Sequence, residues 1–203
     1  MESKVPLVIS EGGKIQQLPT FPGDPDGIAF AINDWGQAVG VSADCSLTAG
    51  HALLWQNGKA TDLGNLGPNG LPGAGNHACA INNKGQTVGH TTSKASTVAF
   101  LWTRDKGMQG LGTLTGDFAS FALGINDEGE VVGQSIDATF STARAFLWQK
   151  GTMTDLNTLV AVNHGKLYLL LGESINTRSE IIGLAVDTVG KFHGYLAIPN
   201  AAK

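Results

Sequence analysis

Four copies of one short block constrain the fold more than any other feature of the sequence. The first copy, AINDWGQAVG, starts at residue 31, and in every copy a glycine follows the isoleucine at a distance of 8 residues. The later copies are AINNKGQTVG from residue 80, GINDEGEVVG from residue 124 and SINTRSEIIG from residue 174. A second block, HALLW from residue 51, and a third, TDLGNLG from residue 61, recur after the first in the same order. The repeating unit is therefore about 45–50 residues long and occurs four times.

Each unit is predicted to form four short antiparallel strands. The pattern Asn-Asp-x-Gly between the first and second strands is typical of a tight hairpin in which glycine takes a positive φ angle. Four-stranded units of this length are typical of β-propeller blades, and we recognise neither helical periodicity nor helix caps. We therefore predict an all-β fold, a small β-propeller with four blades of four antiparallel strands.

The two ends of the sequence are out of phase with the repeat, which predicts how the ring is closed. The last unit contains only the first three strand types, whereas residues 14–18 resemble a fourth strand and precede the first unit. Pairing of these N- and C-terminal strands would remove open sheet edges, and residues 5–10 would add an outermost strand. The prediction is a single domain over residues 1–203, with a part of a larger array as the alternative. Its units span about 6–50, 51–97, 98–143 and 144–203.

Composition excludes several classes of protein. With 42% hydrophobic residues the chain is too apolar to be disordered, and its 28 glycines indicate many turns. The net charge of −4 argues against a nucleic-acid partner. No apolar run reaches the ~20 residues of a membrane span, so no membrane partner is expected. Cys45 and Cys79 either form one bridge or remain free thiols.

The repeated blocks resemble the HAF-repeat family of probable extracellular repeat proteins. The resemblance rests on HALLW at 51–55, AFLW at 99–102 and 145–148, TDLGNLG at 61–67, and the Ile-Asn-x-x-Gly-Gln-x-Val-Gly pattern at 32–40 and 81–89. It implies a propeller-like β repeat, often in secreted bacterial proteins, and implies no activity. Extracellular or periplasmic localisation follows from this resemblance. The start, MESKVPLVIS, has no apolar leader segment, so a complete chain would be cytoplasmic.

The connections between strands predict one functional face. Tight turns of nearly fixed length would lie at one end of the ring, and the long, variable loops at the other. Such loops on a rigid scaffold commonly carry binding or catalytic residues. They span residues 19–27, 41–50, 64–76, 90–97, 112–120, 134–143, 157–166 and 184–192.

All five histidines and several acidic residues fall in these loops or at their edges. Histidine and carboxylate side chains together could bind a ligand, and a metal ion on the loop face is an alternative. No fixed metal-ligand spacing is recognisable, and we predict no cofactor. His51 and His193 occupy equivalent repeat positions, which favours a structural hydrogen bond instead. The candidate ligand-binding residues are His51, His90, His193, Asp24, Asp26, Asp117 and Asp137.

One acidic residue interrupts the apolar pattern of the first strands. Glu173 takes the place that Phe30, Cys79 and Leu123 have in the other units, and a buried carboxylate there would be costly unless paired or protonated. A perturbed acid near a propeller axis is a catalytic candidate, and His77 and His164 are its candidate partners. The alternative is a distorted last unit in which the carboxylate is paired.

Most other repeated residues are interpreted as scaffold. The tryptophans at 55, 102 and 148 are expected to pack between blades, and the repeated asparagines to bond their own turns. The sequence therefore favours a binding module that uses the loop face and an axial pocket for a small molecule, a glycan or a protein. The alternative is a small propeller enzyme, a hydrolase, lyase or cyclase, that uses Glu173 with loop His and Asp residues.

Overall fold

The computed structural model describes residues 8–11, 14–44, 50–66, 75–92, 96–161 and 166–200. Its elements are antiparallel strands and one short helix, as predicted for an all-β protein. The N-terminal hairpin pairs β1 (Val8–Glu11) with β2 (Lys14–Gln17). The first full sheet contains β3 (Asp26–Ile32), β4 (Ala38–Ala43), β5 (Gly50–Gln56) and β6 (Lys59–Asp62).

Three further sheets repeat this meander. The second contains β7 (His77–Ile81), β8 (Thr87–Thr92), β9 (Thr97–Thr103) and β10 (Gly107–Gly112). The third contains β11 (Ala119–Ile125), β12 (Val131–Ile136), β13 (Ala143–Gln149) and β14 (Thr152–Asp155), followed by helix α1 (Leu156–Leu159). The fourth has three strands, β15 (Tyr168–Ile175), β16 (Ile181–Val186) and β17 (Phe192–Ala197). Each sheet thus contains the strands of one repeat in order, beginning with the Ile-Asn block, so the sheets are out of phase with the predicted bounds of about 6–50, 51–97, 98–143 and 144–203. The four units are numbered by sheet below.

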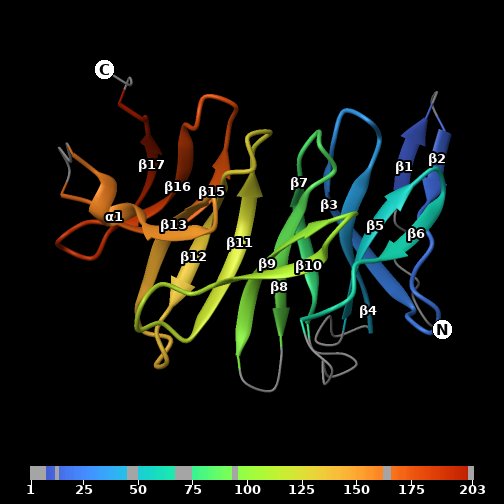
Figure 1. Ribbon diagram of the computed structural model, residues 1–203, viewed down its shortest axis with the longest axis horizontal. Coiled ribbons are helices and arrows are strands. Elements are labelled where there is room, and N and C mark those ends of the chain that lie inside the picture. The colour runs from blue at the N-terminus through green and yellow to red at the C-terminus, as the bar shows by residue number, and fades with distance from the viewer. Residues whose placement is uncertain are drawn as a thin grey trace.

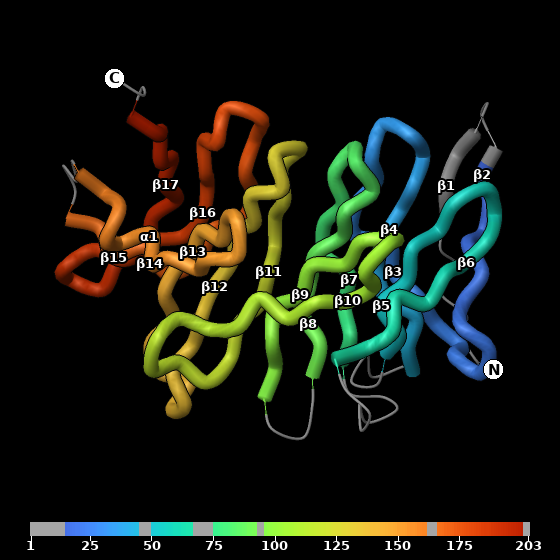
Figure 2. Tube along the Cα trace, in the orientation of Figure 1, coloured from blue at the N-terminus to red at the C-terminus, as the bar shows by residue number. Residues whose placement is uncertain are grey.

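The sheets follow one another in a row, with the N-terminal hairpin at one end and the fourth sheet at the other (Figure 1). The predicted closure by pairing of the terminal strands is not found. Strand β2 pairs with β1 in a two-stranded sheet, and β17 pairs with β16. Figure 2 follows the chain from β2 to β17 and places these two strands at opposite ends of the row. The sequence correctly predicted which strand types each end carries, but not where they pair.

Each pair of neighbouring sheets encloses its own apolar core. Between the first and second sheets, Val39 and Leu54 pack with Ile81 and Phe100. Equivalent residues fill the spaces between the second and third sheets and between the third and fourth. Leu18, which follows the N-terminal hairpin, packs with Ala38, Leu53 and Trp55 on β4 and β5 of the first sheet. Stability in such an array comes from contacts between adjacent units.

A β-bulge at one repeated position explains the glycine that ends each first block. In all four sheets the pairing register of the first two strands shifts at the same place, opposite Gly40, Gly89, Gly133 and Gly183. A Cβ atom on any of these glycines would overlap the carbonyl oxygen of the paired first strand. The first strands of neighbouring sheets also approach one another closely, since a Cβ on Gly124 would lie 3.0 Å from Ser174 Cα.

Helix α1 corrects the expectation that the chain has no helix caps. Asp155 is extended, with φ −66° and ψ 119°, and its side chain accepts a hydrogen bond from Asn157 N at 2.9 Å. This is an N-cap on a single helical turn. Among the described residues, no helix is long and apolar enough to cross a membrane.

Candidate functional site

The four turns between first and second strands lie side by side along one edge of the row, which we call the turn end (Figure 1). Residues 32–34, 81–83, 125–127 and 175–177 together line a shallow hollow of about 330 Å³. The repeated asparagines bond their own turns as predicted: Asn33 Oδ1, for example, accepts from Trp35 N and Gln37 N. The first strands therefore converge at this end.

The same asparagines also connect neighbouring turns, which the sequence did not predict. Asn33 Nδ2 donates to Asn82 O at 3.0 Å, Asn82 Nδ2 to Asn126 O at 2.9 Å, and Asn126 Nδ2 to Asn176 O at 3.1 Å. We call this chain of side-chain to backbone bonds the asparagine ladder. Asn82 and Asn126, in its middle, are buried. The ladder stabilises the relative positions of the four turns, because a buried amide group left without a hydrogen-bond partner costs free energy.

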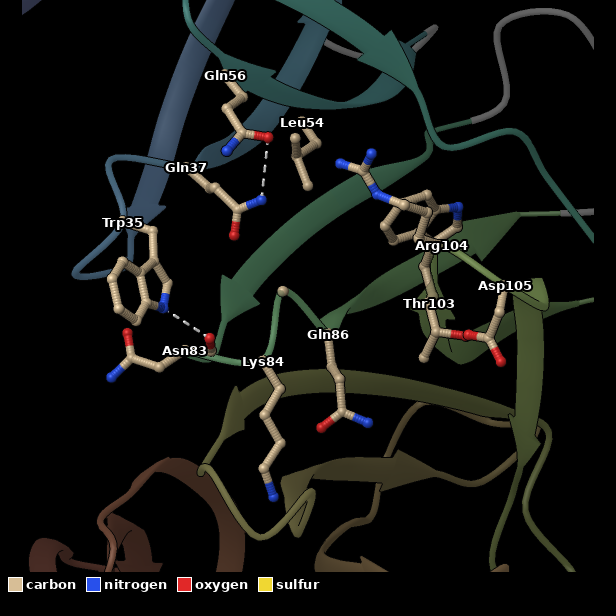
Figure 3. Close-up of a pocket in the computed structure, with 12 residues that line it drawn as sticks. Trp35, Gln37, Leu54, Gln56, Asn83, Lys84, Gln86, Thr103, Arg104 and Asp105 are labelled. Atoms are coloured by element: carbon tan, nitrogen blue, oxygen red, sulfur yellow. Dashed lines mark hydrogen bonds between the residues drawn. The ribbon is translucent and has the colours of Figure 1, made fainter.

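A cleft of about 560 Å³ opens between the first two sheets at this turn end (Figure 3). Two tryptophans and three glutamines give it aromatic and amide surfaces, and three ionisable side chains lie at its rim. Its size is within the range of small-molecule sites. Its side chains belong to Trp35, Gln37, Leu54, Gln56, Asn83, Lys84, Gln86, Trp102, Thr103, Arg104 and Asp105.

The most exposed aromatic group of the cleft has a fixed orientation. Trp35 is 70% exposed, yet its indole Nε1 donates to Asn83 O at 2.9 Å across the cleft (Figure 3). Gln37 Nε2 donates to Gln56 Oε1 at 3.2 Å on the same side of the cleft as Trp35. The cleft therefore offers an ordered aromatic face beside amide groups. Trp35 is absent from the predicted site because it lies in a tight turn; its only sequence signal is that the equivalent residues are Lys84, Glu128 and Arg178.

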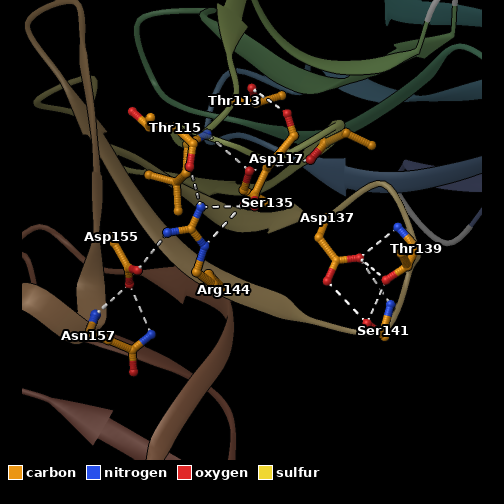
Figure 4. Close-up of polar contacts among 12 residues, drawn as sticks. Thr113, Thr115, Asp117, Ser135, Asp137, Thr139, Ser141, Arg144, Asp155 and Asn157 are labelled. Atoms are coloured by element: carbon orange, nitrogen blue, oxygen red, sulfur yellow. Dashed lines mark hydrogen bonds and ion pairs between the residues drawn. The ribbon is translucent and has the colours of Figure 1, made fainter.

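At the loop end, predicted ligand-binding residues form polar contacts within the scaffold. His51 Nδ1 lies 2.9 Å from Asp24 Oδ2, which also accepts from Ser42 Oγ. In the third unit Arg144 takes the place of His51 and bonds Asp117 Oδ1 at 2.9 Å (Figure 4). In both sheets, therefore, the aspartate that precedes the first strand contacts a basic side chain on the third strand of the same sheet. This favours the structural interpretation of these positions.

The other acidic and histidine candidates of the loop end also have partners. His193 Nε2 lies 2.9 Å from Asp187 Oδ2. Asp137 accepts from Thr139 and Ser141 within its own loop (Figure 4), and the hydroxyl of Thr139 contributes most to lowering the pKa of Asp137. Asp26 is buried in β3. His164 lies outside the described residues. Within the described ranges, no group of three or more His, Cys, Asp or Glu side chains is arranged to hold a metal ion.

A separate cluster brings together His77, His90 and Cys79 on β7 and β8. The two imidazole rings stack at 4.8 Å, and Phe121 contacts His90 edge-on at 4.9 Å. Burial, with a smaller contribution from His77, lowers the pKa of His90 to about 4. Burial raises the pKa of the free Cys79 thiol to about 12, and the charge of Glu173 adds to this. Both His90 and Cys79 are therefore neutral at pH 7, and Cys79 lacks the thiolate that a nucleophile requires.

The predicted burial of Glu173 is wrong, although its proximity to the histidine cluster is real. Glu173 is the bulged residue of β15 and is exposed. Of the residues at the equivalent position in the other sheets, Phe30 is exposed, and Cys79 and Leu123 are half-buried. The bulge turns this position away from the cores between sheets, so a carboxylate there carries no burial cost.

The repeated tryptophans are mostly scaffold, as expected. Trp55 is buried and donates from Nε1 to Pro19 O at 2.7 Å, and Trp148 packs against the core between the second and third sheets. Trp102 packs in the first core but also borders the cleft. Asp62, at the end of β6, accepts a hydrogen bond from Gly64 N through Oδ1 at 2.9 Å.

Comparison of the sequence with known families and proteins found no match. No protein-family model matches the sequence, and no curated protein is significantly similar to it. The resemblance of the repeated blocks to the HAF-repeat family remains a prediction.

Proposed function

We propose that the four sheets are blades of a propeller-like repeat and that the chain is a binding module for a saccharide. The binding site would be the cleft between the first two sheets. The single observation that carries the proposal is the ordered indole of Trp35 beside amide side chains in a cleft of about 560 Å³. The convergence of the four Asn turns on one hollow supports the propeller-like arrangement.

The chemistry of the cleft fits a sugar ring. A pyranose presents C–H groups on its faces and hydroxyl groups on its rim. An aromatic face can pack against the former, while amides both donate to and accept from the latter. Gln37, Gln56 and Gln86 provide these amides, and Arg104 and Asp105 extend polar contacts to the rim.

A binding function is better supported than the predicted propeller enzyme. The histidines at 51 and 193 are paired with carboxylates. His90 is uncharged at neutral pH because its pKa is about 4. Glu173 is exposed and remains the candidate acid of the enzyme hypothesis. Its conversion to glutamine, with turnover and stability measured together, tests that alternative.

The binding proposal is tested by screening the labelled protein on a glycan array and measuring the best ligand by calorimetry. Trp35→Ala should weaken binding at least tenfold, about 1.4 kcal/mol, because an aromatic anchor is removed. Glu128→Ala is the matched control, since Glu128 is exposed and has the equivalent turn position in the third unit. An array without any saturable ligand, or equal affinity of the Trp35 variant, would contradict the proposal.

A further inference from the structure

The two ends of the row of sheets expose complementary halves of one interface. The isoleucine that ends each first strand is 7–9% exposed in the second, third and fourth sheets, where the preceding sheet covers it. In the first sheet the equivalent Ile32 is 59% exposed. Leu18, which follows the N-terminal hairpin, packs with Ala38 on β4 and with Leu53 and Trp55 on β5, and leaves Ile32 on the innermost strand β3 uncovered. The inner part of this face, which we call the front face, is therefore open.

The fourth sheet is open on its opposite side, which we call the back face. Val39, Val88 and Val132 on the second strands are 0% exposed, whereas the equivalent Ile182 is 50% exposed. On the third strand Leu196 is 58% exposed. Its counterpart in the first sheet, Leu54, is buried between sheets. Large apolar side chains in a contiguous exposed patch are typical of an interaction site.

We propose that the back face of the fourth sheet binds the front face of the first sheet of a second copy of this chain. Contacts of this kind, between the back face of one sheet and the front face of the next, occur three times within the chain. Each copy has both halves, and the association is therefore head-to-tail. Because the two faces lie at opposite ends of the row (Figure 1), a second copy can supply the contact without rearrangement of the chain.

The asparagine ladder continues across this contact. Within the part of the chain that the structure describes, Asn176, the last member, donates through Nδ2 only to Glu180 of its own turn. In the second copy, Asn33 O occupies the position that accepts from Nδ2 in each internal step. Arg178, which pairs with Glu180 at 2.6 Å within its own turn, has a side chain 76% exposed and would lie beside the turn that carries Asp34.

Light scattering after size exclusion tests the proposal on the full chain. The wild-type protein should have a mass of at least twice the 21.1 kDa of one chain at high concentration and should dissociate on dilution. Ile182→Asp should be monomeric, because it places a carboxylate in the contact. Val189→Asp, with the same change of charge on an 85% exposed residue of the β16–β17 loop, should associate as the wild type does.

Ile32→Asp decides whether the contact is head-to-tail. It should also be monomeric, because every contact of the proposed kind uses one front face. Circular dichroism should be unchanged in each variant, since these side chains are already exposed in one chain. A wild-type protein that is monomeric at high concentration would overturn the proposal. So would an Ile182 or Ile32 variant that still associates.

Discussion

The contribution of the asparagine ladder to the free energy of unfolding can be predicted, because Asn176 serves as a control for Asn126. Asn126 and Asn176 have the same local bonds: each Oδ1 accepts from two backbone amides of its turn, and each Nδ2 donates to the glutamate four residues later. Only Asn126 also donates to the next turn, to Asn176 O at 3.1 Å. Asn126 is 4% exposed, whereas Asn176 is exposed. Replacing each by alanine therefore separates the ladder from the turn.

We expect Asn176→Ala to cost about 1 kcal/mol of unfolding free energy, since water replaces the bonds of an exposed turn. Asn126→Ala should cost about 3 kcal/mol, because water cannot replace the lost bonds at this buried position and the bond to Asn176 O is lost as well. Urea unfolding followed by tryptophan fluorescence measures both, and the midpoint should fall at an unchanged denaturant slope. Equal losses for the two variants would refute the assignment of stability to the ladder.

Two further predictions concern the bulge and the histidine cluster. Gly133→Ala should lose about 2–3 kcal/mol in the same unfolding assay, because its Cβ overlaps Phe121 O. Gly194→Ala, with no atom near its Cβ, should stay within about 0.5 kcal/mol of wild type, and similar losses would contradict the steric account. The pKa of His90 is lowered from 6.5 to about 4, so the unfolded chain binds more protons between these values. Thermal stability should therefore fall as pH decreases from about 6.5 to about 4, and less steeply in His90→Gln; identical slopes would contradict the burial of a neutral imidazole.

The repeat alone predicted much of the fold, because each unit carries the signals of its own strands. The Asn-x-x-Gly turns, the small residues of the first strands and the glycine opposite each bulge all act within one unit or between neighbours. Closure failed as a prediction because it depends on where two distant strands lie, and no local pattern in residues 14–18 or 193–199 encodes that distance.

The candidate site was predicted less well for a physical reason. Histidine and acidic residues were predicted as site residues because they are reactive groups. In the structure, His51 pairs with Asp24 in the first sheet, and Arg144 pairs with Asp117 at the equivalent position of the third sheet. The cleft instead depends on Trp35 and its glutamine neighbours, which are chemically unreactive and lie in a turn of standard length. Comparison of the units position by position would have found Trp35, because the equivalent residues are all charged.

The saccharide cleft is tested most directly by the indole signals of the four tryptophans in an NMR titration. The ¹⁵N-labelled protein is titrated with the best ligand from the array, and the Nε1–H peaks are assigned by single substitutions. The account predicts saturable shifts for Trp35 and Trp102, which border the cleft, with Trp55 and Trp148 unaffected. Shifts confined to Trp55 or Trp148, or no saturable shift at Trp35, would contradict a binding site between the first two sheets.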